Sequence, residues 1–453
     1  LDGKATMIVK YQLPSVGTTF TSTYTIFGNG IVHVNNNLKS TEYEGDIPRI
    51  GMRMQLPKSY NQLSYFGRGP WENYQDRKAS AFIDLYNSNV SEQYVPYIRP
   101  QENGYKTAAI GKWHLGHKKQ YLPLQHGFDY YYGIPYSNDM ENINGGAIPV
   151  KDHYWKIYDS EKPVSDNYKV PLLENNEIIE RPADQTTITK RYTDKAVYFI
   201  RKNKDENFFI YLAHNLPHTP LYASDEYRGR SKRGLYGDVV EEIDHGVGLI
   251  MEELKKNSLE KNTIVVFTSD NGPWLPFEQH SGSAGLLRNG KGTSWEGGHR
   301  VPGIFWGGPI KKGMVDELGS TLDIFPTILE MLGVENIKDR IMDGVSLKNT
   351  LYHGKPSKRE MIFYYRSREI YAVRYKQYKA HFITQGVYNY PPGSNKKIIL
   401  KEPLLYNLDV DPSERYNIAD ENPDILRQIK TIVDEHKRNL DLPDDLLQYR
   451  ESD

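Results

Sequence analysis

The pattern of apolar residues changes once along this 453-residue chain, at residues 102–116 (ENGYKTAAIGKWHLG). Before this stretch, apolar and polar residues alternate with a period of two, as in residues 7–13 and 19–34, and turns such as Gly-Asn-Gly at 28–30 separate the runs. This pattern predicts antiparallel strands in a β-sandwich. After the stretch, short apolar runs alternate with segments of helical periodicity. The second pattern is typical of a parallel sheet covered by helices.

The second part of the chain supplies the elements of an α/β domain. Residues 192–201 and 238–255 carry apolar side chains at helical spacing, and residues 208–214 (FFIYLAH) and 263–270 (TIVVFTSD) have the composition of buried strands. This alternation predicts a mostly parallel sheet sandwiched by helices. Beyond about residue 338 the strands shorten and alternate, and a helix over 423–439 follows, which predicts a small antiparallel sheet with a packed helix. The expected domains are 1–103, 104–337 and 338–453.

Composition excludes several function classes. The 57 Lys and Arg residues balance 58 Asp and Glu residues, so net charge gives no reason to expect a nucleic-acid partner or an anionic membrane surface. The sequence has no cysteine, which excludes disulfides, thiolate metal sites and a cysteine nucleophile. No run of 18 apolar residues predicts a membrane span, and the first residues lack a signal-peptide pattern. The chain begins with Leu, which suggests that its true beginning is missing.

Polar residues follow the first predicted strand of the α/β part. The run TAAI at 107–110 leads directly into GKWHLG, so a buried strand delivers Lys112 and His114 to its carboxyl end. Ligands of open α/β sheets bind at that edge, where a cation and an imidazole can face one anionic substrate. The alternative is a surface loop with a lysine whose stem lies along the surface and a structural histidine.

Two later strand ends also carry polar groups. After FFIYLAH, His214 and His218 are four residues apart, but Pro217 and Pro220 prevent a helix, so we favour a rigid loop that holds His218 as a proton donor over a zinc-binding pair. After TIVVFTSD come Asp270 and Asn271. They could form a tight turn, but after a buried strand their oxygens make half of a site for Ca²⁺ or Mg²⁺.

A glycine-rich stretch, residues 282–302, contains one lysine. Residues 285–291 imitate a nucleotide-binding loop, but Gly292 stands where such a loop needs Ser or Thr, and no strand precedes it. We therefore expect the loop to bring Lys291 close to a tetrahedral oxyanion instead.

Together these motifs resemble the sulfatase family of the alkaline-phosphatase-like superfamily, over residues 103 to about 440. The segments that carry the resemblance are GYKTAAIGKWHLG (104–116), HGFDYYYGIPYSND (126–139), LPHTP (216–220), VVFTSDNG (265–272), GLLRNGKGTSWEGGHRVP (285–302) and LYNLDVDPSERYN (405–417). The resemblance implies an alkaline-phosphatase-like fold and hydrolysis of sulfuric esters, on a sulfated carbohydrate or an aryl sulfate. By analogy with the family, it also implies a periplasmic or secreted location.

The resemblance also implies roles for single residues. Lys112, His114 and Lys291 would bind the sulfate, and Ser137 would line the site. His218 would assist departure of the leaving alcohol, and we count it with His114 as catalytic. Asp270 and Asn271 would ligate Ca²⁺.

Two parts of the family pattern are missing from this sequence. The family nucleophile is a formylglycine made from the first residue of a Cys-or-Ser-x-Pro-x-Arg signature, and the sequence contains neither a cysteine nor Ser-x-Pro-x-Arg. The Asp-Asp pair that supplies two further calcium ligands is not found before the first α/β strand either. The resemblance thus leaves half of the metal site and no precursor of the nucleophile.

Residues 1–104 resemble a different family, the last β-sandwich domain of β-galactosidases of glycoside hydrolase family two. The resemblance lies in GRGPWENYQDRK (67–78) and YVPYIRPQENG (94–104). We find no pair of carboxylates of the kind that glycoside hydrolysis needs. Because ENGYKT (102–107) suits both families, we hypothesise that two genes were joined there, in a genome or in sequence assembly. The alternative functions are a non-catalytic sulfoglycan-binding protein and a β-galactosidase accessory fragment.

Overall fold

A computed structural model of the chain describes residues 3–13, 18–40, 62–69, 82–89, 104–141, 168–334, 341–386 and 395–440. The chain divides into two compact units, Leu1–Val95 and Pro96–Asp453. The expected domain boundaries at 103 and 337 lie outside the described residues, so they stay predictions. Among the described residues, no helix has the length and apolar character of a membrane span.

The described residues of the first unit lie in β-strands and one turn. Strands β1 (Lys4–Leu13), β2 (Thr18–Phe27) and β3 (Val32–Ser40) form an antiparallel sheet in that order, and β4 (Gln62–Gly69) pairs with β5 (Phe82–Asn89). The predicted Gly-Asn-Gly turn joins β2 to β3, with the Asn29 side chain accepting a hydrogen bond from the Ile31 amide at 3.1 Å. The two segments that carry the β-galactosidase resemblance lie for the most part outside the described residues.

The second unit is built around a five-stranded sheet in the order β10-β6-β7-β8-β9. Strand β6 (Tyr105–Gly111) runs parallel to β10 (Asn207–Ala213) on one side and to β7 (Tyr130–Gly133) on the other. Strands β8 (Leu172–Glu174) and β9 (Glu177–Glu180) extend the sheet in antiparallel fashion. The predicted run TAAI forms the buried centre of β6, where Ala108, Ala109 and Ile110 are at most 2% exposed.

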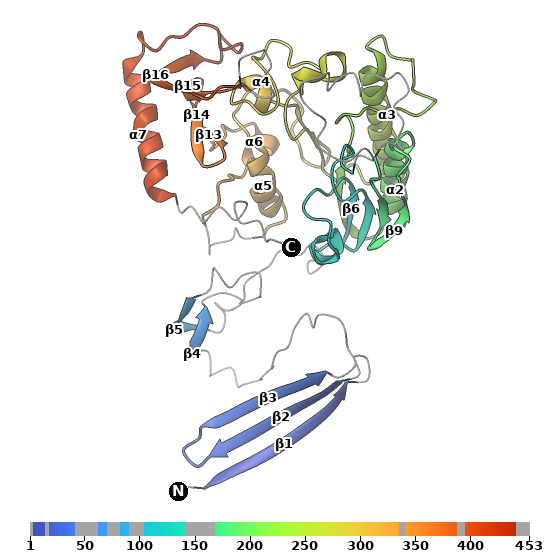
Figure 1. Cartoon of the computed structure of the whole chain (residues 1–453), viewed down its shortest axis with the longest axis vertical. Helices are drawn as coiled ribbons and strands as arrows, with labels where there is room; N and C mark the ends of the chain where they lie inside the picture. Colours follow the sequence, from blue (N-terminus) through green and yellow to red (C-terminus); the bar gives the residue numbers. More distant parts are fainter. Residues whose placement is uncertain are drawn as a thin grey trace. The chain divides into compact units, whose positions relative to one another are not determined.

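One long helix packs on this sheet, and a second long helix packs on the first (Figure 1). Helix α2 (Ile188–Lys202) packs on β6 and β10 through apolar side chains at helical spacing, among them Tyr192 and Ala196. Helix α3 (Gly234–Lys256) lies against α2, and a Cβ at Gly246 would come within 2.4 Å of the Thr193 hydroxyl. The small residue therefore sets how closely the two helices approach.

The expectation that FFIYLAH and TIVVFTSD are buried strands is wrong in part. Strand β10 forms the edge of the five-stranded sheet, and Tyr211 on it is 46% exposed. Strand β11 (Val265–Thr268) pairs among the described residues only with β12 (Gly303–Trp306), antiparallel, and Phe267 is 41% exposed. Both strands are half buried, because each has only one neighbouring strand among the residues that the structure describes.

The C-terminal part is a four-stranded antiparallel sheet closed by a helix, as predicted (Figure 1). Its strands follow the chain order: β13 (Met361–Arg366), β14 (Glu369–Tyr375), β15 (Tyr378–Thr384) and β16 (Ile398–Asn407). Helix α7 (Pro423–Asn439) packs on the sheet through Ile429 and Val433. The α/β fold class with this additional sheet is thereby confirmed.

The remaining elements are short. They are the helices α4 (Glu296–His299), α5 (Ile324–Met331) and α6 (Lys348–His353), and the 3-10 turns η5 (Lys119–Tyr121), η6 (Pro123–Gln125), η8 (Leu275–His280) and η9 (Thr321–Asp323).

Candidate functional site

The end of β6 is held in place by backbone hydrogen bonds from the three residues that follow it. Gly111 has a φ of +111°, and a Cβ there would lie 1.9 Å from the Ala213 carbonyl oxygen, so only glycine fits. The Lys112 amide then donates to that oxygen at 2.7 Å, and the His114 amide donates to the Pro135 carbonyl at 3.0 Å. These bonds fix Lys112 and His114 between the ends of β10 and β7.

His218 stands in the loop after β10, and the loop after β7 holds it. Asn138, which is fully buried, donates from its amide nitrogen to the carbonyls of His218 at 3.4 Å and Pro220 at 3.0 Å. The His218 Nδ1 lies 2.7 Å from the Thr219 carbonyl oxygen and 3.5 Å from the Ser137 hydroxyl. A carbonyl oxygen can only accept, so Nδ1 carries the proton and Nε2 is the basic nitrogen of the neutral ring.

Lys291 and His218 both contact Trp274. The Lys291 amide donates to the Pro273 carbonyl at 2.8 Å, and its ammonium nitrogen lies 4.7 Å from the centre of the Trp274 ring. The centres of the His218 and Trp274 rings are 5.5 Å apart. Trp274 therefore brings the glycine-rich loop and the His218 loop to one place. We did not predict this residue, although it follows Asp270 by only four positions in the sequence.

The pKa shifts of His114 and Lys291 show that several charges lie close together. Burial lowers the pKa of His114, and the cations of Lys112 and Lys291 lower it further. Burial likewise lowers the pKa of Lys291, which Asp270 raises and Lys112 lowers. Partly buried cations that disfavour each other's charge are stabilised by an anion placed between them.

His218 belongs to the same cluster of charges. Burial lowers its pKa; the carboxylate of Asp139 opposes that shift, and Lys291 and Lys112 add to it. Asp139 was not among the predicted residues, although it follows Ser137 and Asn138 directly in IPYSND. The structure thus brings together Lys112, His114, Ser137, His218, Asp270 and Lys291, while the role of each residue stays a prediction.

Asp270 and Asn271 lie side by side after β11. The Asn271 amide nitrogen donates to the Asp270 carboxylate, which leaves the buried Asn271 Oδ1 without a hydrogen-bond partner among the described residues. An unpaired amide oxygen beside a carboxylate suits a hard cation such as Ca²⁺. Among the residues that the structure describes, no group of three or more His, Cys, Asp or Glu side chains is arranged to bind a metal. Two side chains fall short of the six or more oxygens that Ca²⁺ takes.

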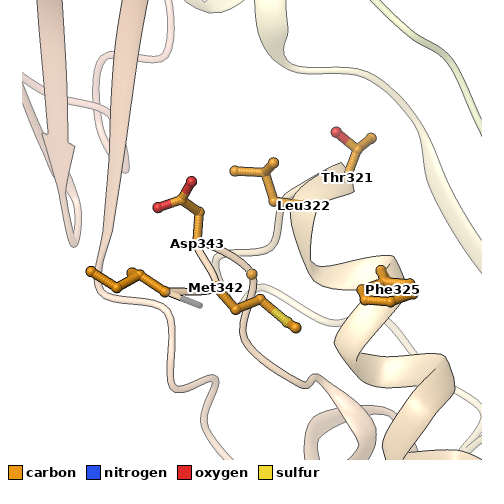
Figure 2. Close-up of a pocket in the computed structure, with 7 residues that line it drawn as sticks. Thr321, Leu322, Phe325, Met342 and Asp343 are labelled. Carbon is orange, nitrogen blue, oxygen red and sulfur yellow. The ribbon is translucent and has the colours of Figure 1, made fainter. Parts of the chain in front are cut away.

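A hollow lined by other residues differs in character from this cluster of charges (Figure 2). It measures about 490 Å³ and is lined by Thr321, Leu322, Phe325, Ile341, Met342, Asp343 and Gly344. None of these lining residues is cationic or belongs to the predicted site. This apolar hollow is therefore not a candidate for binding an anion.

Comparison with known families agrees with both resemblances. The sulfatase family profile matches residues 89–334, and the profile of the C-terminal region of aryl-sulfatase matches residues 357–452. The profile of the beta galactosidase small chain matches residues 2–141. The sulfatase and β-galactosidase matches therefore overlap across the stretch where the pattern of apolar residues changes.

Individual relatives give the same result. An arylsulfatase of Hemicentrotus pulcherrimus is 34% identical over 369 residues, which is 75% of this chain and 65% of the relative. An N-acetylgalactosamine-6-sulfatase of Mus musculus is 36% identical over 379 residues, 77% of this chain and 69% of the relative. The chain thus spans about two thirds of the length of these relatives. Among solved structures, the PsFucS1 sulfatase from Pseudoalteromonas sp. superposes with a TM-score of 0.61 at 27% identity, covering 76% of this chain and 74% of that one.

Proposed function

Because this chain belongs to the sulfatase family, we propose that its function is the hydrolysis of sulfuric esters. In this proposal the cluster of Lys112, His114, His218 and Lys291 binds the sulfate group of the ester. The observation that carries the proposal is that burial together with nearby lysines lowers the pKa of His114, His218 and Lys291. A sulfate placed among them neutralises their repulsion, so part of the binding free energy comes from charges that are already held together.

Sulfated carbohydrates are the ligand class that we favour. One relative with 36% identity is an N-acetylgalactosamine-6-sulfatase, an enzyme named for a sulfated amino sugar. Another relative is an arylsulfatase, so an aryl sulfate is a suitable second ligand for an assay. The cluster of Lys112, His114, His218 and Lys291 would contact the sulfate group, which both kinds of ester carry.

The neutral state of His218 suits a proton donor that acts only when the anion is bound. Burial and the neighbouring lysines keep its pKa below the usual range in the free protein. A bound sulfate has the opposite effect and raises that pKa, so the ring gains a proton at Nε2. The protonated Nε2 then donates to the ester oxygen and stabilises the leaving alkoxide.

The two groups that the family implies fit this chain to different degrees. Asp270 and Asn271 would hold one side of a calcium ion, which would add positive charge next to the sulfate. The formylglycine does not fit, because the sequence has neither a cysteine nor a Ser-x-Pro-x-Arg segment to provide it. We derive no step through it. Loss of a nucleophile lowers kcat on the order of a millionfold in a well-studied hydrolase, so we expect this chain to bind esters but to turn them over slowly.

An assay on a chromogenic aryl sulfate tests the proposal in two arms. The first arm uses the chain as it is, and the second replaces residues 1–102 by a sulfatase N-terminal segment that bears the signature, expressed with its maturation system. We expect turnover only in the second arm, abolished there by Lys291→Met. Robust turnover by the unaltered chain would reveal a nucleophile that we have not recognised. An inactive graft in which formylglycine is detected by mass spectrometry would contradict the proposal.

The match of residues 2–141 to the beta galactosidase small chain supports a second candidate, an accessory fragment of a β-galactosidase. Retention of the full chain on an unsulfated galactoside resin would favour it. Elution by a sulfated sugar, but not by its desulfated form, would favour the sulfate-binding site instead.

A further inference from the structure

Four ionisable side chains that are not among the predicted site residues are buried together. Glu296 lies on α4, Lys379 and His381 lie on β15, and Glu414 lies in the loop before α7, each with a side chain at most 2% exposed. The Lys379 ammonium is 2.8 Å from Glu296 Oε1 and 3.3 Å from Glu414 Oε1, and His381 Nε2 is 2.7 Å from Glu414 Oε1. We call these four residues the buried charged cluster.

Together with Arg374, the buried charged cluster is balanced in charge and well paired. Arg374 lies 3.6 Å from Glu296 Oε2, and the Tyr364 hydroxyl donates to Glu296 Oε1 at 3.1 Å. Burial alone would raise the pKa of Glu296, but the cations of Lys379 and Arg374 outweigh it and keep the pKa low. Burial lowers the pKa of His381 to about 4, so this ring is neutral near pH 7. Two carboxylates therefore face two cations.

Replacing a buried ion pair by apolar side chains of similar volume is often neutral or stabilising, so stability alone does not explain a paired buried charge cluster. A requirement for one defined geometry is the explanation that we pursue. The geometry joins two parts of the chain that are far apart in sequence. Glu414 Oε2 accepts a hydrogen bond from the Glu296 backbone amide at 2.7 Å, so the loop before α7 holds the first residue of α4. The C-terminal sheet thereby determines where α4 lies.

The segment that ends at α4 carries Lys291 and has further attachments to the C-terminal part. Arg288 donates to the Glu414 carbonyl at 2.7 Å, and Ser413 donates to the Leu286 carbonyl at 2.5 Å. At the other end of the segment, the Trp295 ring stacks on His381 with centres 4.1 Å apart. Both ends of residues 286–296 are thus fixed to the C-terminal part, with Lys291 between them.

Helix α4 also contacts the turn that carries the candidate calcium ligands. The Gly272 amide donates to the Gly298 carbonyl at 3.1 Å, and a Cβ at Gly272 would lie 1.8 Å from the Gly297 carbonyl oxygen. A shift of α4 would therefore displace Asp270 and Asn271 together with Lys291.

We propose that the buried charged cluster positions the sulfate-binding site: the C-terminal sheet, through Lys379, His381 and Glu414, holds α4 and the loop of Lys291 at the distance from His218 that sulfate binding requires. Its members are positioning residues, because none of them touches the ligand. The inference rests on the proposed function only in taking Lys291 as a sulfate ligand.

A charge-balanced double variant tests the inference in the full chain. Lys379→Met combined with Glu296→Gln removes one positive and one negative charge, so the net charge does not change. Glu414 keeps its hydrogen bonds with His381 Nε2 and the Glu296 backbone amide. The matched control is Lys397→Met with Glu369→Gln, which removes an exposed ion pair of the same C-terminal sheet. We expect the cluster variant to bind inorganic sulfate about tenfold more weakly than the wild type in calorimetric titration, and the control to bind it equally well.

A second readout separates positioning from loss of stability. Lys291 lowers the pKa of His218, so a displaced Lys291 allows that pKa to rise. NMR titration of the His218 ring should therefore show a higher pKa in the cluster variant and an unchanged one in the control. A folded cluster variant with wild-type sulfate affinity and wild-type His218 pKa would overturn the inference.

Two further variants make every outcome informative. If the double variant does not fold, Arg288→Met decides, because it cuts the loop's bond to the Glu414 carbonyl and leaves all four residues of the buried charged cluster in place. Weaker sulfate binding supports the inference, and unchanged binding overturns it. Lys291→Met separates the two proposals. If it leaves the sulfate affinity unchanged, the proposed function and the inference built on it both fail, whereas a loss in Lys291→Met without a loss in the cluster variant removes the inference alone.

Discussion

Acid should destabilise the second unit, in part through the buried histidine His381. Its side chain is fully buried, and burial lowers its pKa from 6.5 to about 4 despite the hydrogen bond with Glu414. Between these two values the unfolded chain binds a proton that the folded chain does not. The free energy of unfolding therefore falls as the pH drops from 6.5 towards 4.

The magnitude follows from the two pKa values. One pKa unit corresponds to about 1.4 kcal/mol, so His381 costs about 2 kcal/mol of stability at about pH 5 and about 3 kcal/mol once the pH is below the folded-state value. Above the unfolded-state value of 6.5, the histidine has no such effect. A loss of about 2 kcal/mol is a large share of the stability of an ordinary domain.

Urea denaturation at about pH 7 and about pH 5 measures this loss, followed by tryptophan fluorescence because Trp295 stacks on the His381 ring. His381→Gln removes the titrating group while keeping a hydrogen-bond donor towards Glu414. The wild type should lose about 2 kcal/mol more than this variant between the two pH values. His353→Gln, at an exposed position of α6, should behave as the wild type does. Equal losses in the wild type and His381→Gln would refute the reasoning, because they would mean that the folded protein accepts the proton.

Two predictions concern the sulfate-binding site. The pKa of His218 lies below 6.5 in the free protein and should be higher in the sulfate complex. Because the anion binds together with a proton, sulfate affinity should increase as the pH falls through the interval between these two pKa values. Calorimetry at a series of pH values would show this increase, and an affinity independent of pH would contradict it. Calcium binding should be weak, because Asp270 and Asn271 supply only part of the ligand set. Tight, stoichiometric binding in a calcium titration would point to further ligands.

Local sequence patterns predicted the elements and several site residues well. The helix over 423–439 has the predicted bounds, since its apolar spacing and its proline start are both local signals. Lys112 and His114 were predicted because they follow a buried strand whose small and apolar residues are contiguous in sequence. The prediction that β10 and β11 are buried was wrong, because an apolar run does not tell whether a strand has one or two neighbouring strands.

Contacts between residues far apart in the sequence could not be predicted from local sequence patterns. Trp274 and Asp139 are within a few positions of predicted residues in the sequence. Nothing in their local sequence pattern shows that they lie near Lys291 and His218 in space. The buried charged cluster joins residues up to 118 positions apart, as in the bond between the Glu296 amide and Glu414. Charged residues are usually exposed, so a single sequence gives no reason to place Lys379 and Glu414 in the core.

The most direct test of the sulfate-binding site is a calorimetric comparison of one oligosaccharide in its sulfated and desulfated forms, titrated into the full chain. The account predicts saturable binding of the sulfated form alone, weakened by at least about tenfold in Lys291→Met and in Lys112→Met, since charge-assisted contacts to an anion are lost. Equal binding of both forms, or binding of neither by the folded chain, would contradict it.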